Sequence, residues 1–152
     1  MTLNSLISSN QILLDIESTD LGDVISEMVS FAATLTGADS ELANNWEASF
    51  LQREKEFSTG IGNGVAIPHA FCDHIEDTVI VMGRSKVGVD FESLDNQPVN
   101  VVVLFVSPRQ EFQKHLHVLA AIGKSFRHPE LVESIVSSKS ADEVLAAIKY
   151  KG

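Results

Sequence analysis

The chain of 152 residues has a single cysteine, Cys72, and no run of lysine or arginine residues. One thiol cannot form an internal disulfide, so a reducing compartment is expected. The formal net charge is −10 at pH 7, which repels phosphate backbones and anionic membrane surfaces. Nucleic-acid binding is therefore not expected, whereas a protein partner with a basic face is compatible with this charge.

Long hydrophobic runs are also missing. The longest, Val101–Val106, has the length of a strand and is too short to span a bilayer. Residues 1–10 contain no basic segment, and the apolar stretch Ile12–Ile16 is too short for a signal peptide. These features predict a cytoplasmic protein without direct membrane insertion.

The composition that remains is that of a globular protein. Hydrophobic residues make up 44% of the chain and charged residues 21%, and the length is sufficient to bury a core. Neither an internal repeat nor a low-complexity linker divides the sequence. We therefore expect residues 1–152 to form a single domain.

The hydrophobic pattern predicts helices before and after a group of strands. Helical spacing over residues 21–35 ends at Gly37, and a second helix that begins near Asp39 places Arg53 close to its C-terminal end. Strands are expected at residues 12–14, 65–67, 78–85, 87–91 and 99–106, and the last has the pattern of a strand buried on both faces.

Three further helices are predicted in the C-terminal part. The first has a buried stripe formed by Phe112, Leu116, Leu119, Ile122 and Phe126. The second has Pro129 in its first turn, and the third begins with a capping box from Ser140 to Glu143. Strands between two groups of helices predict an α/β sandwich whose sheet is covered on both faces.

Glycines alternate with other residues in the segment Ser58–Gly64. Glycine lets backbone amides approach an anion closely, and unpaired amides can form an anion-binding nest. The segment is not a Walker A loop, because no Gly-Lys-Ser/Thr follows, and it lacks the spacing and the helix of a Rossmann fingerprint. A plain turn is the alternative. The candidate phosphate-binding residues are Ser58, Thr59, Gly60, Gly62, Asn63 and Gly64.

Pro68 and His69 follow directly after the short apolar strand Val65–Ile67. Proline restricts the backbone that leads into the histidine, and strand ends carry catalytic groups in α/β sheets. A neutral imidazole is nucleophilic near pH 7 and can pass a phosphoryl group onward. Arg53 offers a bidentate fork for phosphoryl oxygens. The alternatives are a structural histidine and a solvated arginine at a helix end.

His115 and His117 lie on opposite faces of the predicted helix, about 200° apart at 100° per residue. His115 borders the apolar stripe and can reach a site on the sheet, unless it is only a histidine at the core edge. His117 is expected to be exposed. The spacings of Cys72 with His74 and of His115 with His117 are poor for metal binding, so no metal site is expected.

Four segments together resemble the mannitol/fructose class of enzyme IIA of the bacterial phosphoenolpyruvate-dependent phosphotransferase system. They are Arg53-Glu54, Ser58–Gly64, Val65–His69 and His115-Leu116-His117. The segment Asp95–Val99 and the His-Leu-His sequence are more similar to the nitrogen-regulatory branch of this class. The resemblance covers essentially the whole chain, and its motif from Ser58 to His69 is long and specific.

The resemblance implies an α/β fold with a mixed β-sheet sandwiched between helices, and no bound cofactor. It implies that His69 is phosphorylated by a histidine phosphocarrier protein, that His115 assists without being phosphorylated, and that Arg53 faces the phosphate. Phe57 and Phe71 depart from the family pattern, which leaves the choice of partner open. If Phe71 is exposed near His69, it provides an apolar anchor for a partner.

Two functions are compatible with the resemblance. The protein is either a regulatory switch that binds target proteins differently when phosphorylated, or a transport component that passes the phosphoryl group to a permease enzyme IIB domain of the fructose/mannitol type. The nitrogen-type motifs favour the switch. No residue indicates which sugar would be involved.

Overall fold

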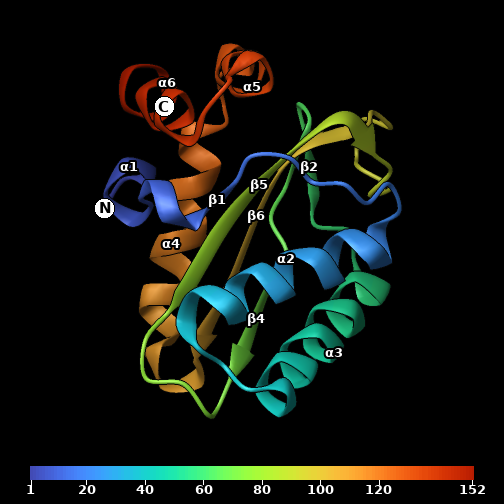
Figure 1. Cartoon of the computed structure of the whole chain (residues 1–152), viewed down its shortest axis with the longest axis vertical. Helices are drawn as coiled ribbons and strands as arrows, with labels where there is room; N and C mark the ends of the chain where they lie inside the picture. Colours follow the sequence, from blue (N-terminus) through green and yellow to red (C-terminus); the bar gives the residue numbers. More distant parts are fainter.

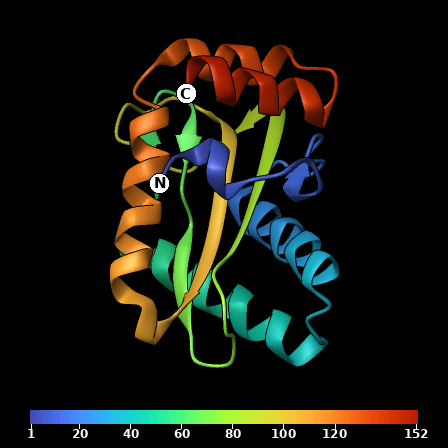
Figure 2. The same cartoon turned by 90° about the vertical axis from the view of Figure 1, so that its left-hand side faces the viewer.

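The computed structural model describes all residues, Met1–Gly152. A mixed sheet of six strands lies between helices, as Figures 1 and 2 show. In chain order the elements are α1 (Leu3–Leu6), β1 (Ile12–Leu13), α2 (Leu21–Thr36), α3 (Ser40–Glu56), β2 (Gly60–Gly62), β3 (Val65–Ala66), β4 (His69–Cys72), β5 (Val79–Val89), β6 (Val99–Pro108), α4 (Phe112–Ser125), α5 (Pro129–Ser137) and α6 (Ala141–Lys151). Two 3₁₀ turns, Ser9–Gln11 and Arg109–Glu111, precede β1 and α4.

Local chemistry explains where α2 and α3 begin and end. The side chains of Asp20 and Asp39 accept hydrogen bonds from the backbone N–H groups of Asp23 and Leu42, and so cap the two helices. Helix α2 ends at Gly37, whose φ of 74° is a left-handed conformation that glycine adopts without a Cβ clash. Both helices were predicted from the sequence, and the prediction is confirmed.

The strands are ordered β1-β5-β6-β3-β2, and β4 also pairs with β6. Strand β6 is parallel to β3 and β4 and antiparallel to β5, so the sheet is mixed. Nearly every residue of β6 is buried, because helices cover both faces of the sheet at this strand. This central position explains the continuous run of Val, Leu and Phe, and it confirms the prediction for residues 99–106.

Two predictions about the elements were wrong. The strands expected at residues 78–85 and 87–91 form the single strand β5, in which the pairing register shifts between Arg84 and Val89. In α6, Ser140 caps the helix, but the carboxylate of Glu143 accepts from the backbone N–H of Lys139, so the reciprocal capping box does not form.

The apolar stripe predicted for α4 is confirmed at Leu119, Ile122 and Phe126, which pack in the core, and is wrong at its N-terminal end. Phe112 and Leu116 are 55% and 46% exposed, although both belong to the predicted stripe. The buried face of α4 also includes Val118, together with His115.

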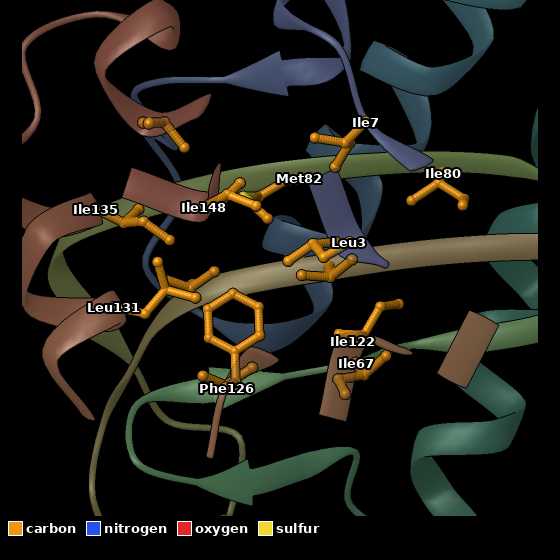
Figure 3. Close-up of a cluster of buried hydrophobic side chains, with 14 of the residues drawn as sticks. Leu3, Ile7, Ile67, Ile80, Met82, Ile122, Phe126, Leu131, Ile135 and Ile148 are labelled. Atoms are coloured by element: carbon orange, nitrogen blue, oxygen red, sulfur yellow. The ribbon is translucent and has the colours of Figure 1, made fainter. Parts of the chain in front are cut away.

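The sheet separates two clusters of buried side chains. Helices α2 and α3 cover one face and contribute Met28, Trp46 and Phe50 to the first cluster. The second cluster, shown in Figure 3, joins α1 and the C-terminal helices to the other face and includes Leu3 and Phe126. Each large apolar side chain buried in this way contributes about 1.5–3 kcal/mol to stability. None of the helices has both the length and the apolar character that crossing a membrane requires.

Candidate functional site

An open cavity of about 640 Å³ lies between the C-terminal half of α3, strand β4 and the start of α4. Its lining includes all three residues predicted to carry out the chemistry: Arg53, His69 and His115. A second open cavity, of about 790 Å³, lies beside the turn between α2 and α3 and contains none of them. The chemistry of the side chains, and not cavity size, therefore selects the first cavity as the candidate site.

The sequence suggested that His69 lies at the end of a strand. In the structure it is instead the first residue of β4. Strands β3 and β4 both pair with β6, and Pro68 interrupts them while its carbonyl accepts a hydrogen bond from the N–H of Phe105. The interruption turns the half-buried imidazole of His69 into the cavity. Because β4 is paired along its length with β6, the backbone of His69 is held rigidly.

The tautomer of His69 follows from its hydrogen bond. Nδ1 lies 2.6 Å from the carbonyl oxygen of Ile67, and a carbonyl only accepts, so Nδ1 carries the proton and Nε2 has a free lone pair. Burial lowers the pKa of His69 in spite of this hydrogen bond, and the positive charge of Arg53 lowers it further. The ring is therefore neutral at pH 7, with a nucleophilic Nε2.

His115 lies next to His69, with 5.5 Å between the ring centroids. Its side chain is buried, and its Nδ1 lies 2.9 Å from the hydroxyl oxygen of Ser107. Burial, and then the neighbouring His69, lowers the pKa of His115 to about 4. His117 is exposed and does not line the cavity, so the prediction that the two histidines occupy different faces of the helix is confirmed.

Arg53 lies in the last turn of α3 and has no carboxylate partner. Its Nη1 donates to the carbonyl oxygen of Phe57 at 3.1 Å, and its guanidinium lies 5.7 Å from the centre of the Phe57 ring. The carboxylate of the adjacent Glu54 accepts hydrogen bonds from the backbone N–H and hydroxyl of Thr59. The positive charge of Arg53 is thus available to an anion in the cavity.

A second arginine, Arg109, also lines the cavity and was not predicted from the sequence. Its Nε donates to the carboxylate of Asp73 at 3.0 Å, and its guanidinium lies 5.8 Å from the centre of the Phe71 ring. Arg109 directly follows Pro108, the last residue of the buried strand β6. That position at the end of a central strand was the signal that could have identified it.

The glycine segment, predicted as a phosphate-binding loop, does not line this cavity, so that prediction stays a prediction. The segment forms the β2–β3 hairpin, whose turn is made by Gly62, Asn63 and Gly64, all with positive φ. Figure 1 shows β2 and β4 at opposite ends of the sheet. None of the six predicted residues lines the cavity, namely Ser58, Thr59, Gly60, Gly62, Asn63 and Gly64.

Three backbone amides of this segment are also already engaged. Those of Thr59, Gly60 and Asn63 donate to the carboxylate of Glu54, the hydroxyl of Ser58 and the carboxylate of Asp95. Glycine is needed at position 60 because a Cβ there would lie 2.2 Å from the hydroxyl oxygen of Ser93. Packing thus explains the glycine at position 60, and turn geometry explains Gly62 and Gly64.

Comparison with known proteins places the chain in a family. The family model for the phosphoenolpyruvate-dependent sugar phosphotransferase system, EIIA 2, matches residues 5–151. A nitrogen regulatory protein of Bradyrhizobium diazoefficiens is 31% identical over 97% of this chain and 95% of its own length. The fructose-specific EIIABC component of Bacillus subtilis is 33% identical over 97% of this chain, which spans only 23% of that longer protein.

Solved structures agree with this assignment. The nitrogen regulatory protein IIA-Ntr from Neisseria meningitidis has a TM-score of 0.86 and 25% identity, over 96% of this chain and 98% of that one. IIA mannitol from Escherichia coli has a TM-score of 0.78 over 93% and 98% of the two chains, and its 20% identity supports the fold alone. The chain belongs to the EIIA 2 family of the phosphoenolpyruvate-dependent sugar phosphotransferase system.

Proposed function

We propose that Nε2 of His69 accepts a phosphoryl group from a histidine phosphocarrier protein, and that the phosphohistidine makes this protein a regulatory switch of the nitrogen type. One observation carries the chemical part of the proposal. The carbonyl of Ile67 holds the proton of His69 on Nδ1, so Nε2 presents its lone pair in an open cavity that also contains Arg53.

The transfer step conserves charge and atoms. The Nε2 lone pair attacks the phosphorus of the donor's phosphohistidine, the donor's P–N bond breaks, and its electron pair returns to the donor's imidazole nitrogen. The Nδ1–H group of His69 remains bonded to the carbonyl of Ile67, which stabilises the positive charge that the ring gains. Arg53, which has no carboxylate partner, neutralises the incoming phosphoryl oxygens through its fork of N–H donors.

The regulatory part of the proposal rests on the similarity of this chain to a nitrogen regulatory protein, which it matches over 95% of that protein's length. The alternative is onward transfer to an enzyme IIB domain of a fructose- or mannitol-type permease. Its support is the 33% identity to one portion of a fructose-specific EIIABC component. The same phosphohistidine serves both functions, so the partner decides between them.

Intact-mass spectrometry tests the acceptor. Incubation with phosphoenolpyruvate, enzyme I and the phosphocarrier protein should add one acid-labile phosphoryl group to the wild-type chain and to the control His117→Ala. His69→Ala should remain unmodified, and normal labelling of that variant would disprove the assignment. Phosphorus–nitrogen coupling in NMR spectra of labelled protein identifies Nε2 as the modified atom.

A pull-down with wild-type and His69→Ala protein tests the partner. Recovery of a kinase, channel or transcription factor supports the switch. Recovery of a permease enzyme IIB domain, followed by transfer of the phosphoryl group to it, supports the transport function.

A further inference from the structure

We propose that Ser107 and Thr78 are positioning residues that hold the proton of His115 on Nε2, so that this ring donates a hydrogen bond to the phosphoryl group on His69. The assignment of the tautomer rests on hydrogen bonds within the chain. Its consequence for phosphoryl transfer rests on the proposed function.

Three side chains form a continuous hydrogen-bonded series. The hydroxyl of Thr78 donates to the hydroxyl oxygen of Ser107 at 3.2 Å, and the same oxygen lies 2.9 Å from Nδ1 of His115. Ser107 is fully buried in β6, where its backbone pairs with Phe71 of β4, so its hydroxyl has no access to solvent. Water therefore does not compete with Thr78 and His115 for the hydroxyl of Ser107.

Proton counting along this series gives the tautomer that we propose. A hydroxyl group has one proton and two lone pairs. In the proposed series Thr78 is the donor to Ser107, so the single proton of Ser107 is left for its other neighbour, Nδ1 of His115. Nδ1 then accepts, and the proton of the neutral imidazole lies on Nε2.

The position of the His115 ring lets its Nε2–H group donate to a phosphoryl group on His69. His115 is stacked on Phe71 at 4.1 Å between centroids and also contacts Phe105 at 4.7 Å, so the ring cannot rotate freely. It lines the same cavity as His69, and only Nε2 has no partner in the chain. With a pKa of about 4 the ring is neutral at pH 7, and only the tautomer protonated at Nε2 can donate. The other tautomer would present a lone pair to negatively charged oxygens.

The Nε2 atoms of the two neighbouring histidines therefore have opposite protonation states and opposite roles in hydrogen bonding. At His69 a carbonyl that only accepts leaves Nε2 as a nucleophile. At His115 a hydroxyl that donates leaves Nε2 as a hydrogen-bond donor. A hydrogen-bond donor that already points at the charge of the transition state needs no reorganisation during the reaction. Ser107 and Thr78 contribute by keeping the Nε2–H group of His115 in this state.

Nitrogen-15 NMR of the imidazole rings tests the tautomer directly, without any measurement of activity. The wild-type spectrum should show a protonated Nε2 at His115 and a protonated Nδ1 at His69. Ser107→Ala should shift His115 toward the Nδ1-protonated form. A protonated Nδ1 at His115 in the wild-type protein would overturn the proposal, whether or not His69 is a phosphoryl acceptor.

Kinetics test the consequence, with Thr78 providing a matched pair of variants. Thr78→Val removes the hydroxyl and keeps the shape, whereas Thr78→Ser keeps the hydroxyl. We expect Ser107→Ala to slow phosphoryl acceptance about tenfold and Thr78→Val to slow it several-fold, the effect of about one hydrogen bond. Thr78→Ser should react as the wild type does.

A double-mutant cycle separates this role from general destabilisation. In a His115→Ala background, Thr78→Val should have no further effect on the rate, because the ring that it orients is gone. An equal slowing by Thr78→Val with and without His115 would refute the assignment. So would wild-type rates and wild-type imidazole spectra in both Ser107→Ala and Thr78→Val.

Discussion

At the scale of single residues, the site combines a neutral nucleophile with an unpaired positive charge. Arg53 has no carboxylate partner, and the only hydrogen bond that its guanidinium donates within the chain goes to the carbonyl of Phe57. Its charge also contributes to the low pKa of His69. The same residue therefore keeps the acceptor unprotonated and attracts the group that the acceptor receives.

Replacement of Arg53 should separate charge from geometry. Lysine keeps the positive charge and loses the planar fork, so the phosphorylation rate of Arg53→Lys should lie between those of the wild type and Arg53→Ala. We expect Arg53→Ala to be slower by on the order of 100-fold, as for the loss of one charged donor at a transition state. Stopped-flow measurement of transfer from the phosphocarrier decides this. A lysine variant as slow as the alanine variant would show that the fork, and not the charge, is required.

The low pKa of His115 predicts a pH dependence of stability. Between pH 6.5 and about 4 the unfolded chain binds a proton at His115 that the folded chain does not bind. The free energy of unfolding should therefore fall as the pH is lowered through this range, by about 3 kcal/mol from this residue. His69, whose pKa is also lowered, acts in the same direction.

His115→Gln isolates this contribution, since glutamine does not titrate. Urea unfolding at several pH values should give a shallower pH dependence for His115→Gln than for the wild type between pH 6.5 and 4. His117→Gln is the control and should keep the wild-type slope. Parallel curves for the wild type and His115→Gln would contradict a buried neutral imidazole.

At the scale of secondary structure, a buried arginine connects the sheet to α5. Arg84 of β5 is almost completely buried, and its Nη1 donates to the carbonyl oxygens of Ile135, Val136 and Ser138 at the C-terminal end of the helix. Its Nη2 forms an ion pair at 2.8 Å with Asp15, which is 64% exposed. The arginine supplies donors to carbonyls at the helix end, where that of Ile135 also accepts from the backbone N–H of Ser138.

Arg84→Met should therefore destabilise the fold by about 3 kcal/mol, because methionine fills much of the volume and removes the donor that Arg84 supplies to the carbonyls of Val136 and Ser138. Asp15→Asn removes only the exposed half of the ion pair, and its effect should stay below about 1 kcal/mol. Chemical denaturation of both variants measures the difference. Equal losses of stability would assign the effect to the ion pair and not to the helix end.

Elements with local signals were the ones that the sequence predicted. Helix α2 has a capping aspartate and a terminal glycine, and both act within a few residues of the helix that they bound. Strand β5 was divided in two because its register shift and Gly88, with a φ of 88°, interrupt the alternation within one continuous strand. The pairing that holds this strand together comes from β6, which no local pattern reveals.

The site was predicted in part for the same reason. Arg53, His69 and His115 were identified individually, and their common cavity depends on β4 lying beside β6 under α4. The glycine hairpin is close to His69 in sequence, and Thr59 pairs with Ile67, but the turn of the hairpin points away from the cavity toward the opposite end of the sheet. Closeness in sequence to His69 was therefore a poor guide to which residues line the cavity. Ser107, which pairs across the sheet with Phe71, had no local signal in the sequence.

At the scale of the whole molecule, the cavity differs from the rest of the surface. The chain carries a formal charge of −10, yet the cavity contains two arginines, Arg53 and Arg109. Apolar side chains border it, with Phe112 and Leu116 well exposed. Phe71, which the sequence suggested as an exposed anchor, is half-buried between Phe112 and His115. Phe112 is therefore the better anchor for a partner.

Phe112→Ala should weaken binding of the partner protein by about tenfold or more, because exposed aromatic side chains at an interface centre supply much of its energy. Leu94→Ala is a matched control, since Leu94 is 90% exposed and does not line the cavity. Calorimetric titration with the phosphocarrier protein compares the two. Thermal unfolding should be unchanged in both variants, and equal affinities would place the interface elsewhere.

Phosphorylation should change binding of the regulatory target without refolding the molecule. A phosphoryl group adds about −1.5 to −2 charges at neutral pH. At His69 these charges lie in a cavity bordered by Phe112 and Leu116, so a docking partner has to desolvate them or pair them with a cation. We expect the unphosphorylated wild type and His69→Ala to bind the target with the same affinity, and the phosphorylated protein to differ from both by at least about tenfold. Calorimetry measures the three affinities, and amide NMR spectra report whether shifts stay confined to residues near the cavity. Equal affinities in both states would favour onward transfer to an enzyme IIB domain, because a transport component needs the phosphoryl group as cargo and not as a signal.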